Sequence, residues 1–345
     1  MNNNNERIVN LAATLGILAL IIYTCVIAKA LLIPFVCAVV IWHLTVQLSE
    51  SMQKITVNKW NMLFSVALTF SLILSLLFVY FLYASLTHSI NNIISDAPKY
   101  QEKMLAFFHT VEGWTGREID TSKLFSNVNL TDYISMAAFT LTSLAGSVLL
   151  IIIYVIFLII EYKTFDVKIR ALCSTDAKYK KVKAVLERIR SDISAYLKIK
   201  TAMSILTGLL SYLILISFGL RNAEFWAIFI FLMNYIPVVG SIVSIVLTLL
   251  AMAVQFTSLV MLLVLAGLLT AVHVLVGNLI EPKYMGMHLN LSPLVILLSL
   301  AIWGSIWGVI GMLLCVPGMT MINIVLANFQ GTRPIAILLS ADGKI

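Results

Sequence analysis

Long apolar stretches alternate with two polar regions along this chain, and their lengths predict membrane-spanning helices. A helix that crosses a bilayer needs about 20 predominantly apolar residues. Eight apolar stretches approach or exceed that length: residues 11–28, 31–48, 62–86, 134–160, 201–219, 225–254, 259–280 and 294–326. We therefore predict an all-α polytopic membrane protein with about eight membrane segments.

Composition supports this class. The chain is 61% hydrophobic and 11% charged, with a mean hydropathy of +1.00, whereas a soluble domain carries about 25% charged residues. The first apolar run is too long for the core of a signal peptide, so we expect it to remain in the mature protein. Three of the four cysteines lie in apolar stretches and one lies in a basic segment, so no disulfide is expected.

The two polar regions differ in charge. Residues 161–200 hold 11 Lys or Arg and 5 acidic residues, a balance of +6, whereas residues 87–136 hold 4 and 6, a balance of −2. The positive-inside rule places the first region in the cytosol and the second outside. Alternating the spans from there puts both termini in the cytosol.

These patterns divide the chain into five regions. They are N-terminal membrane spans (1–86), an extracytoplasmic helical segment (87–136), one membrane span (137–160), cytosolic basic amphipathic helices (161–200) and a C-terminal membrane transport region (201–345). Within the second region, a helix is expected after the SDAP run at 95–98. Within the fourth, a basic amphipathic helix is expected after Ser174, Thr175 and Asp176. Anionic lipid headgroups are its expected partner, and nucleic acid is not.

The C-terminal region is interrupted by NYIPVVG (234–240), GNLIEPKYMG (277–286) and WGSIWGVIG (303–311). Lipid cannot satisfy the backbone groups that such breaks release, so broken helices occur where the backbone is buried in protein or lines a cavity. Three breaks therefore indicate a path for a solute. Residues 225–254 and 294–326 each number roughly 30, more than one crossing needs, so both are predicted to be re-entrant hairpins. Their tips would bring Pro237 and Gly304 together.

Catalytic and metal-binding motifs are missing from the sequence. The five histidines are isolated, and there is no H-E-x-x-H, P-loop or nucleophile elbow. We expect neither a cofactor nor a metal, and neither an enzyme nor an ATP-driven pump. A secondary transporter of a small-molecule substrate remains.

Candidate residues for the solute path are the polar groups and helix breakers of the C-terminal region. They are Asn234, Tyr235, Pro237, Gly240, His273, Asn278, Glu281, Pro282, Gly304 and Gly308. Pro237 should release the carbonyls of Met233 and Asn234 for a polar solute. His273 is expected either to face a wet cavity or to form a hydrogen bond between helices. For Gly304 and Gly308, a G-x-x-x-G pair, close helix packing is the favoured role.

Several of these motifs resemble one family. KTAMSILTGL (200–209), NYIPVVGS (234–241), GNLIEPKYMG (277–286), WG..WG..GMLLCVP (303–317) and PIAILLS (334–340) are similar to segments of the autoinducer-2 exporter family. The resemblance implies a multi-span inner-membrane protein that forms homo-oligomers. Some members export the quorum-sensing furanone autoinducer-2, and others resemble sodium or lithium/proton antiporters.

Two transport functions follow from the resemblance and the residues together. Export of a neutral, hydroxyl-rich molecule needs amides and carbonyls along the path. A monovalent cation/proton antiporter needs a titratable group there, for which His273 and Glu281 are the candidates. The scarcity of carboxylates in the C-terminal region favours the neutral solute.

Overall fold

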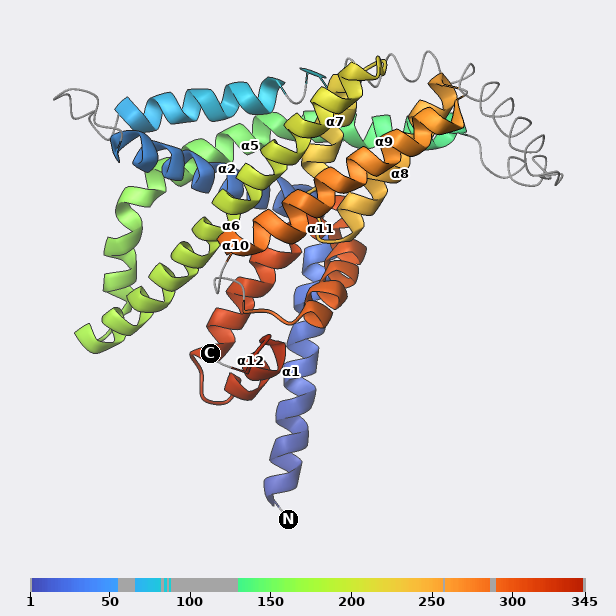
Figure 1. Cartoon of the computed structure of the whole chain (residues 1–345). Coiled ribbons are helices and arrows are strands. Elements are labelled where there is room, and N and C mark those ends of the chain that lie inside the picture. Colours follow the sequence, from blue (N-terminus) through green and yellow to red (C-terminus); the bar gives the residue numbers. More distant parts are fainter. Residues whose placement is uncertain are drawn as a thin grey trace. The chain divides into compact units, whose positions relative to one another are not determined.

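The computed structural model describes residues 2–54, 66–81, 84–85, 87, 130–256, 258–285 and 290–343. These residues form helices and no strand (Figure 1). The helices are α1 (Asn2–Ile27), α2 (Lys29–Lys54), Val66–Phe81, α5 (Leu130–Leu172), α6 (Asp176–Ser217), α7 (Ala223–Met233), α8 (Val239–Gln255), α9 (Leu259–His273), η1 (Val274–Ile280), α10 (Glu281–Met285), α11 (Pro293–Ala327) and α12 (Arg333–Leu339).

The predicted class, a polytopic helical membrane protein, is confirmed. Four of the described helices are long and apolar enough to cross a bilayer, or five if the bent α5 is counted as one span. Four shorter apolar helices accompany them, which include Val66–Phe81 and α7. The external helix predicted after residues 95–98 lies outside the described residues.

The chain forms two compact units. The first unit contains Met1–His43, Leu150–Ile193 and Leu289–Ile345, and the second contains Leu44–Leu149 and Ser194–His288. Within the second unit, a cluster of buried apolar side chains joins the C-terminal end of α6 to α7, α8 and α9. Leu215, Ile230, Met252, Leu265 and Leu269 are its fully buried members.

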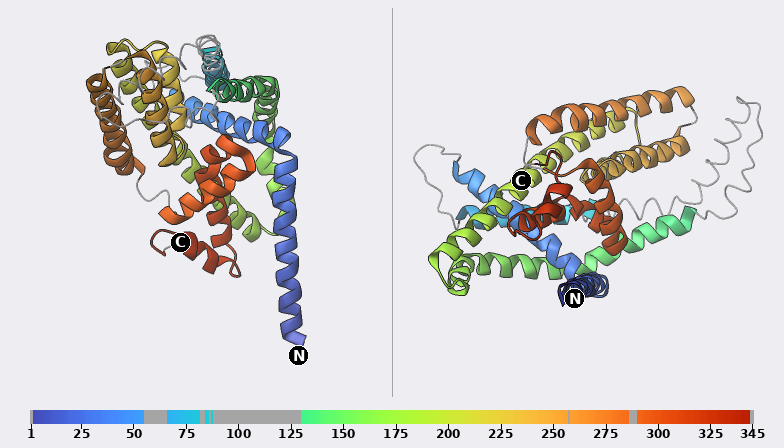
Figure 2. Two further views of the ribbon diagram at one scale, coloured as in Figure 1. Left: turned by 90° about the vertical axis from the view of Figure 1, so that its right-hand side faces the viewer. Right: turned by 90° about the horizontal axis from the view of Figure 1, so that it is seen from below.

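The expected break between the first two apolar stretches lies at Ala28, between α1 and α2. The Ala28 carbonyl accepts hydrogen bonds from Leu31 N (3.0 Å) and Leu32 N (2.9 Å), so the chain changes direction without leaving backbone groups unpaired. Figure 2 shows the bend. In the first unit, the Trp307 indole donates to the Cys25 carbonyl (3.0 Å), which ties α1 to α11.

The basic helix begins where the sequence predicted, but it does not end before the membrane. α6 starts at Asp176, after Thr175, whose hydroxyl accepts from Lys178 N at 3.3 Å. An accepting Thr side chain at this position satisfies one of the unpaired amides of a helix N-terminus. α6 then continues without interruption into the apolar stretch expected at 201–219. One 42-residue helix therefore replaces the two that were predicted.

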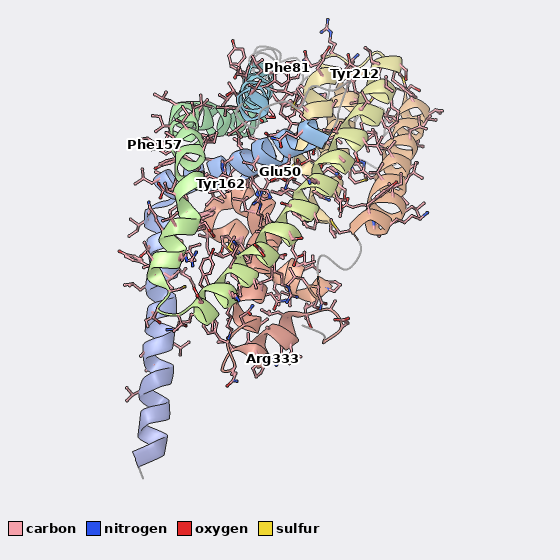
Figure 3. All side chains as sticks on the ribbon, turned by 90° about the vertical axis from the view of Figure 1, so that its left-hand side faces the viewer. Glu50, Phe81, Phe157, Tyr162, Tyr212 and Arg333 are labelled. Atoms are coloured by element: carbon pink, nitrogen blue, oxygen red, sulfur yellow. The ribbon has the colours of Figure 1, made fainter. Side chains whose placement is uncertain are left out.

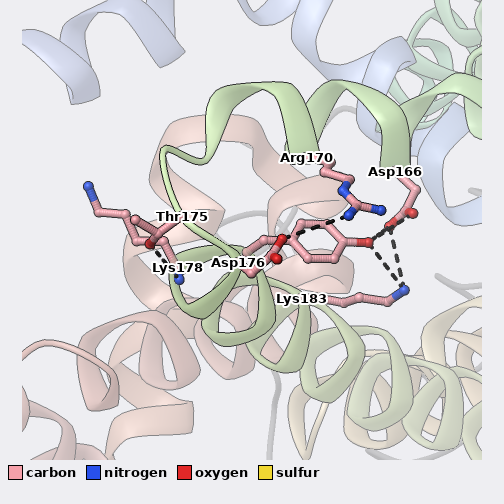
Figure 4. A network of polar contacts seen from close by, with 7 residues as sticks. Asp166, Arg170, Thr175, Asp176, Lys178 and Lys183 are labelled. Atoms are coloured by element: carbon pink, nitrogen blue, oxygen red, sulfur yellow. Dashed lines mark hydrogen bonds and ion pairs between the residues drawn. The ribbon is translucent and has the colours of Figure 1, made fainter.

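A polar network fixes the turn between α5 and α6 (Figure 4). The Tyr179 hydroxyl lies 2.9 Å from both carboxylate oxygens of Asp166. The ammonium of Lys183 donates to Tyr179 (3.4 Å) and lies 3.7 Å from Asp166. These two contacts raise the pKa of Lys183, the hydrogen bond to Tyr179 most of all. Arg170 also lies over the Tyr179 ring, so the turn has a defined structure.

α7 and α8 form a hairpin, as the sequence predicted for residues 225–254. At its open end, the Gln255 side chain accepts from Arg221 N and donates to the Gly219 carbonyl, both at 2.8 Å. The two helices pack along each other, and α8 packs against α9 (Figures 1 and 2). Both ends of the α7–α8 hairpin therefore lie close to the C-terminal end of α6.

The tip between α7 and α8 is a tight turn of unusual geometry. Val238 has φ 61° and ψ −59°, and Val239 N donates to the Pro237 carbonyl at 2.6 Å. This is a γ-turn of the positive-φ type, which is rare and strained for a β-branched residue. The Met233 carbonyl accepts from Ile236 N (2.9 Å). The expectation that Pro237 leaves this carbonyl free for a solute was therefore wrong.

α11 is also a hairpin. Its helical backbone breaks at Gly308, with φ 63° and ψ −141°, and the ribbon turns sharply there (Figure 2). A Cβ on Gly318 would lie 3.2 Å from the Trp303 ring, whereas a straight helix separates positions 15 residues apart by about 22 Å. At the base, Asn323 donates to the Asn290 carbonyl at 3.5 Å. The fold-back predicted for residues 294–326 is confirmed.

The packing role predicted for the G-x-x-x-G pair needs correction. Gly308 is the turn itself, so Gly304 and Gly308 do not form a face on a straight helix. A Cβ on Gly304 would lie 2.7 Å from the end of the Met312 side chain in the other arm. The close approach that this glycine allows is within the hairpin.

Each hairpin closes on a glycine that touches an earlier carbonyl. A Cβ on Gly240 would lie 1.8 Å from the Met233 oxygen, and a Cβ on Gly311 would lie 1.9 Å from the Trp303 oxygen. Atoms cannot approach so closely, so no other residue fits at either position without moving the backbone.

Candidate functional site

One face of α6 carries buried polar side chains in the second unit. Lys200, Ser204, Thr207 and Ser211 follow each other at intervals of four, three and four residues, and all are buried. This spacing places them on one side of the helix. The sequence analysis did not single out this stripe, although its spacing was visible within the KTAMSILTGL motif and just beyond it.

A buried ion pair lies at the start of the stripe. The ammonium of Lys200 donates to the Glu281 carboxylate at 2.7 Å, and the two side chains are only 8% and 13% exposed. A charge can remain in such a place because its partner offsets the loss of hydration. The sequence analysis included Lys200 in the basic region 161–200 and named Glu281 as a candidate titratable group, and it did not predict that the two meet.

The tip of the α7–α8 hairpin is bonded to the same turn of α6. The Asn234 amide donates to the Ser204 hydroxyl at 3.1 Å, and the Tyr235 hydroxyl donates to Thr201 at 2.8 Å. Together with the ion pair, these contacts join three elements at one place. We call this group the α6 junction: Lys200, Thr201, Ser204, Asn234, Tyr235 and Glu281.

A π-helix decides which residue of the next segment reaches Lys200. η1 follows α9 directly and ends one residue before Glu281. A π-turn holds one residue more than an α-turn, so residues beyond it are rotated by about 100° around the axis. Without η1, a different side chain would face α6. Short π-helices are frequent at functional sites.

His273 joins α9 to α8 and is 8% exposed. Its Nδ1 lies 2.9 Å from the Leu269 carbonyl, and its Nε2 lies 3.4 Å from the Ser244 hydroxyl. A carbonyl only accepts, so Nδ1 carries a proton. The single hydroxyl proton of Ser244 is donated to the Ser241 carbonyl (3.0 Å), so the donor in the contact between Nε2 and Ser244 depends on the protonation of Nε2. These are the contacts expected of a hydrogen bond between helices, and a transport role for His273 stays a prediction.

The other predicted residues fall in several places. Pro237 and Gly240 form the tip of the first hairpin, and Asn278 and Pro282 are exposed on η1 and α10. Gly304 and Gly308 belong to the first unit. The predicted meeting of Pro237 with Gly304 therefore stays a prediction. Among the described residues, no group of three or more His, Cys, Asp or Glu side chains is placed to hold a metal ion.

The fold and the polar contacts of the described residues indicate the class of the protein. Helical hairpins with broken tips, one of them bonded to a polar stripe on a spanning helix, are typical of membrane transporters. The sequence matches the model of the AI-2E family transporter family over residues 15–331. The chain therefore belongs to this family, and it is a membrane transporter.

Relatives across bacteria are similar over most of their length. The AI-2 transport protein TqsA of Escherichia coli strain K12 is 28% identical over 336 residues, which cover 96% of this chain and 95% of TqsA. YhhT of the same strain, named as a candidate transport protein, is 29% identical over 79% of each chain. A Haemophilus influenzae protein, also named as a candidate transport protein, is 28% identical over 98% of each.

Proposed function

We propose that this transporter exports a small, neutral, hydroxyl-rich signalling molecule, with autoinducer-2 as the first candidate. The name of the relative TqsA supports this substrate, since that protein is described as an AI-2 transport protein. A secondary transporter needs no nucleotide site, and none is apparent in the sequence.

The chemistry of the α6 junction is the observation that carries the proposal. Between residues 201 and 327 the sequence has two acidic residues, Glu224 and Glu281. Glu224 is exposed in the first turn of α7, and Glu281 is neutralised by Lys200. The remaining junction groups are hydroxyls and an amide. Such groups suit hydroxyl groups of a solute better than a bare cation.

The junction also suggests how the path opens and closes. Three contacts within two turns of α6 hold both the hairpin tip and the start of α10. Exchange of these hydrogen bonds for bonds to a solute would release both elements at once. Alternating access of this kind requires an element with two arrangements, and the hairpin tip is our candidate.

Monovalent cation/proton antiport is the competing function. It requires that Glu281 or His273 gain and lose a proton during transport. Glu281 would have to leave Lys200 to do so, whereas a protonated Nε2 of His273 could donate to the Ser244 oxygen in place. Replacement of His273 by Gln removes the titratable group, so an antiporter that uses it should lose the pH dependence of its transport.

Transport into sealed vesicles that contain the purified protein tests the proposal. Labelled autoinducer-2 and labelled sodium should be measured in parallel, with protein-free vesicles as the control. We expect saturable autoinducer-2 uptake and no sodium flux above the control. Sodium flux driven by a pH gradient, without autoinducer-2 uptake, would reject the proposal in favour of antiport.

Orientation and assembly are part of the proposal. We propose a homo-oligomer in the bacterial inner membrane, with both termini and residues 161–200 in the cytosol, where the basic helix contacts anionic lipid. The Lys200–Glu281 pair supports a cytosolic position for the start of α10 as well. A cysteine at Thr175 or Met287 should resist an impermeant thiol reagent in intact cells, and one at Ser122 should react. The reverse pattern would invert the topology.

A further inference from the structure

Gln47 of α2 has a buried side-chain amide that forms no hydrogen bond with any described residue. Its exposed fraction is 5%. Among the described buried side chains without a hydrogen-bond partner, Gln47 is the one with two unpaired polar atoms, the donor Nε2 and the acceptor Oε1. It lies in a helix that is long and apolar enough to span a membrane.

An unpaired amide in such a place calls for a partner from outside the described chain. Buried polar groups in native proteins are almost always bonded to protein, water or ligand. Polar groups within membrane spans usually face a bundle interior or a wet cavity. Gln47 is already buried inside a single chain, so bulk lipid is not its partner. A solute or a water molecule that enters the protein can supply the missing partner.

Other polar side chains of the chain show what a structural role looks like. Gln255 has the same amide, and both its oxygen and its nitrogen are bonded to backbone at 2.8 Å. Thr207 and Thr248 return their hydroxyls to the carbonyl four residues earlier. A Gln amide in mid-helix has no equally short route to its own backbone, so Gln47 depends on an external group.

Gln47 lies on a different side of α2 from Thr45, and both sides are buried. Thr45 donates to Ser75 of the Val66–Phe81 helix at 3.0 Å. Gln47 follows Thr45 by two residues, and residues two apart point to different sides of a helix. By the same spacing Gln47 shares its side with His43 and Glu50; Figure 3 labels Glu50 on α2.

We propose that Gln47 is a solute-binding residue of the transport path, an inference that rests on the proposed function. Its amide has two N–H donors and one carbonyl acceptor. A neutral solute with neighbouring hydroxyl groups can donate to the oxygen and accept from the nitrogen. The amide therefore selects for hydroxyl-bearing solutes, and it carries no charge that would favour a cation.

Replacement of Gln47 by Leu tests the proposal, with Gln255→Leu as the matched control. Full-length proteins in liposomes are compared by the KM for labelled autoinducer-2 and by melting temperature. For Gln47→Leu we expect KM to rise about tenfold, the equivalent of one hydrogen bond. Its melting temperature should rise by about 2 °C, because an unpaired amide is removed. Gln255→Leu should melt lower, because it leaves two backbone groups unpaired.

Added autoinducer-2 gives a further readout. It should raise the melting temperature of the wild-type protein more than that of Gln47→Leu, since a ligand stabilises the state it binds. An unchanged KM in Gln47→Leu would overturn the inference, and so would a fall in melting temperature like that of Gln255→Leu. A wild-type protein that moves no autoinducer-2 contradicts the proposed function. In that case, a fall in the melting temperature of Gln47→Leu would still overturn this inference separately.

Discussion

The two hairpins solve the same folding problem with different residues. In the α7–α8 hairpin, the turn runs through Val238, and the tip is held by hydrogen bonds from Asn234 and Tyr235 to α6. In α11, Gly308 alone makes the turn, and Trp303 of one arm packs on Gly318 of the other. The first tip is thus strained and fixed by polar contacts, whereas the second is relaxed and fixed by apolar packing.

This difference bears on function. A tip that is held by hydroxyl and amide groups can exchange those bonds for bonds to a polar solute at little net cost, since one hydrogen bond replaces another. Apolar packing offers no such exchange. We therefore expect the first hairpin to move during transport and the second to serve as a fixed support.

The largest effect should come from the glycine that closes each hairpin, Gly240 in the first and Gly311 in the second. Gly240→Ala and Gly311→Ala each place a Cβ within 2 Å of a backbone oxygen, so we expect a loss on the order of 4 kcal/mol or more of folding free energy, or no folded protein. Gly267→Ala is the control, because nothing lies within 4 Å of its Cβ position. Expression and thermal melting in detergent measure the effect. If one of the two variants folds and melts like the wild-type protein, the two tips differ in their need for glycine too.

Removal of one partner of the ion pair should be the next largest change. Lys200→Met leaves the Glu281 carboxylate buried without its cation, which should cost about 3 kcal/mol. The double variant Lys200→Met/Glu281→Met should recover most of this loss, because no buried charge remains. Lys198→Met, at an exposed position of the same helix, is the control. If the double variant melts as low as the single one, the pair does not act as a unit.

The two turn residues should respond in opposite directions. Val238→Gly relieves a positive φ and should raise the free energy of unfolding by about 1 kcal/mol, since Val238 is largely exposed and little burial is lost. Gly308→Ala introduces a Cβ at positive φ and should lower it by about 2 kcal/mol. Changes of the same sign would contradict the assignment of strain to the first tip alone.

The smallest expected effect concerns the polar contacts of the first tip. Asn234→Ala and Ser204→Ala each remove one side of a single hydrogen bond and should cost about 1 kcal/mol. The double variant should cost little more than either single variant, because the two changes remove the same interaction. In the second hairpin, Trp307→Phe removes the bond to the Cys25 carbonyl and serves for comparison. If the two losses of folding free energy add in full, Asn234 and Ser204 do not act through a shared hydrogen bond between the tip and α6.

Hydropathy and helix breakers determined much of this protein without any coordinates. The lengths of the apolar stretches predicted the helical membrane class, and the extra length of residues 225–254 and 294–326 predicted that each turns back. The sequence put the two tips at Pro237 and Gly304, because proline and glycine disrupt a helix wherever they occur, through their own covalent structure. The structure has the turns close by, at Val238 and Gly308. Thr175 and Asp176 marked the start of α6 in the same local way.

Only the tertiary structure decided which polar groups meet. Lys200 and Glu281 are 81 residues apart, and no periodicity within one segment relates them. Their contact depends on the return of the hairpin and on the rotation that η1 introduces, both of which come from packing between helices. Burial likewise separated Gln47 from Gln255. The two amides are alike in sequence, but one is bonded on both sides and the other is left open, because hydrogen-bond partners are supplied by neighbours in space.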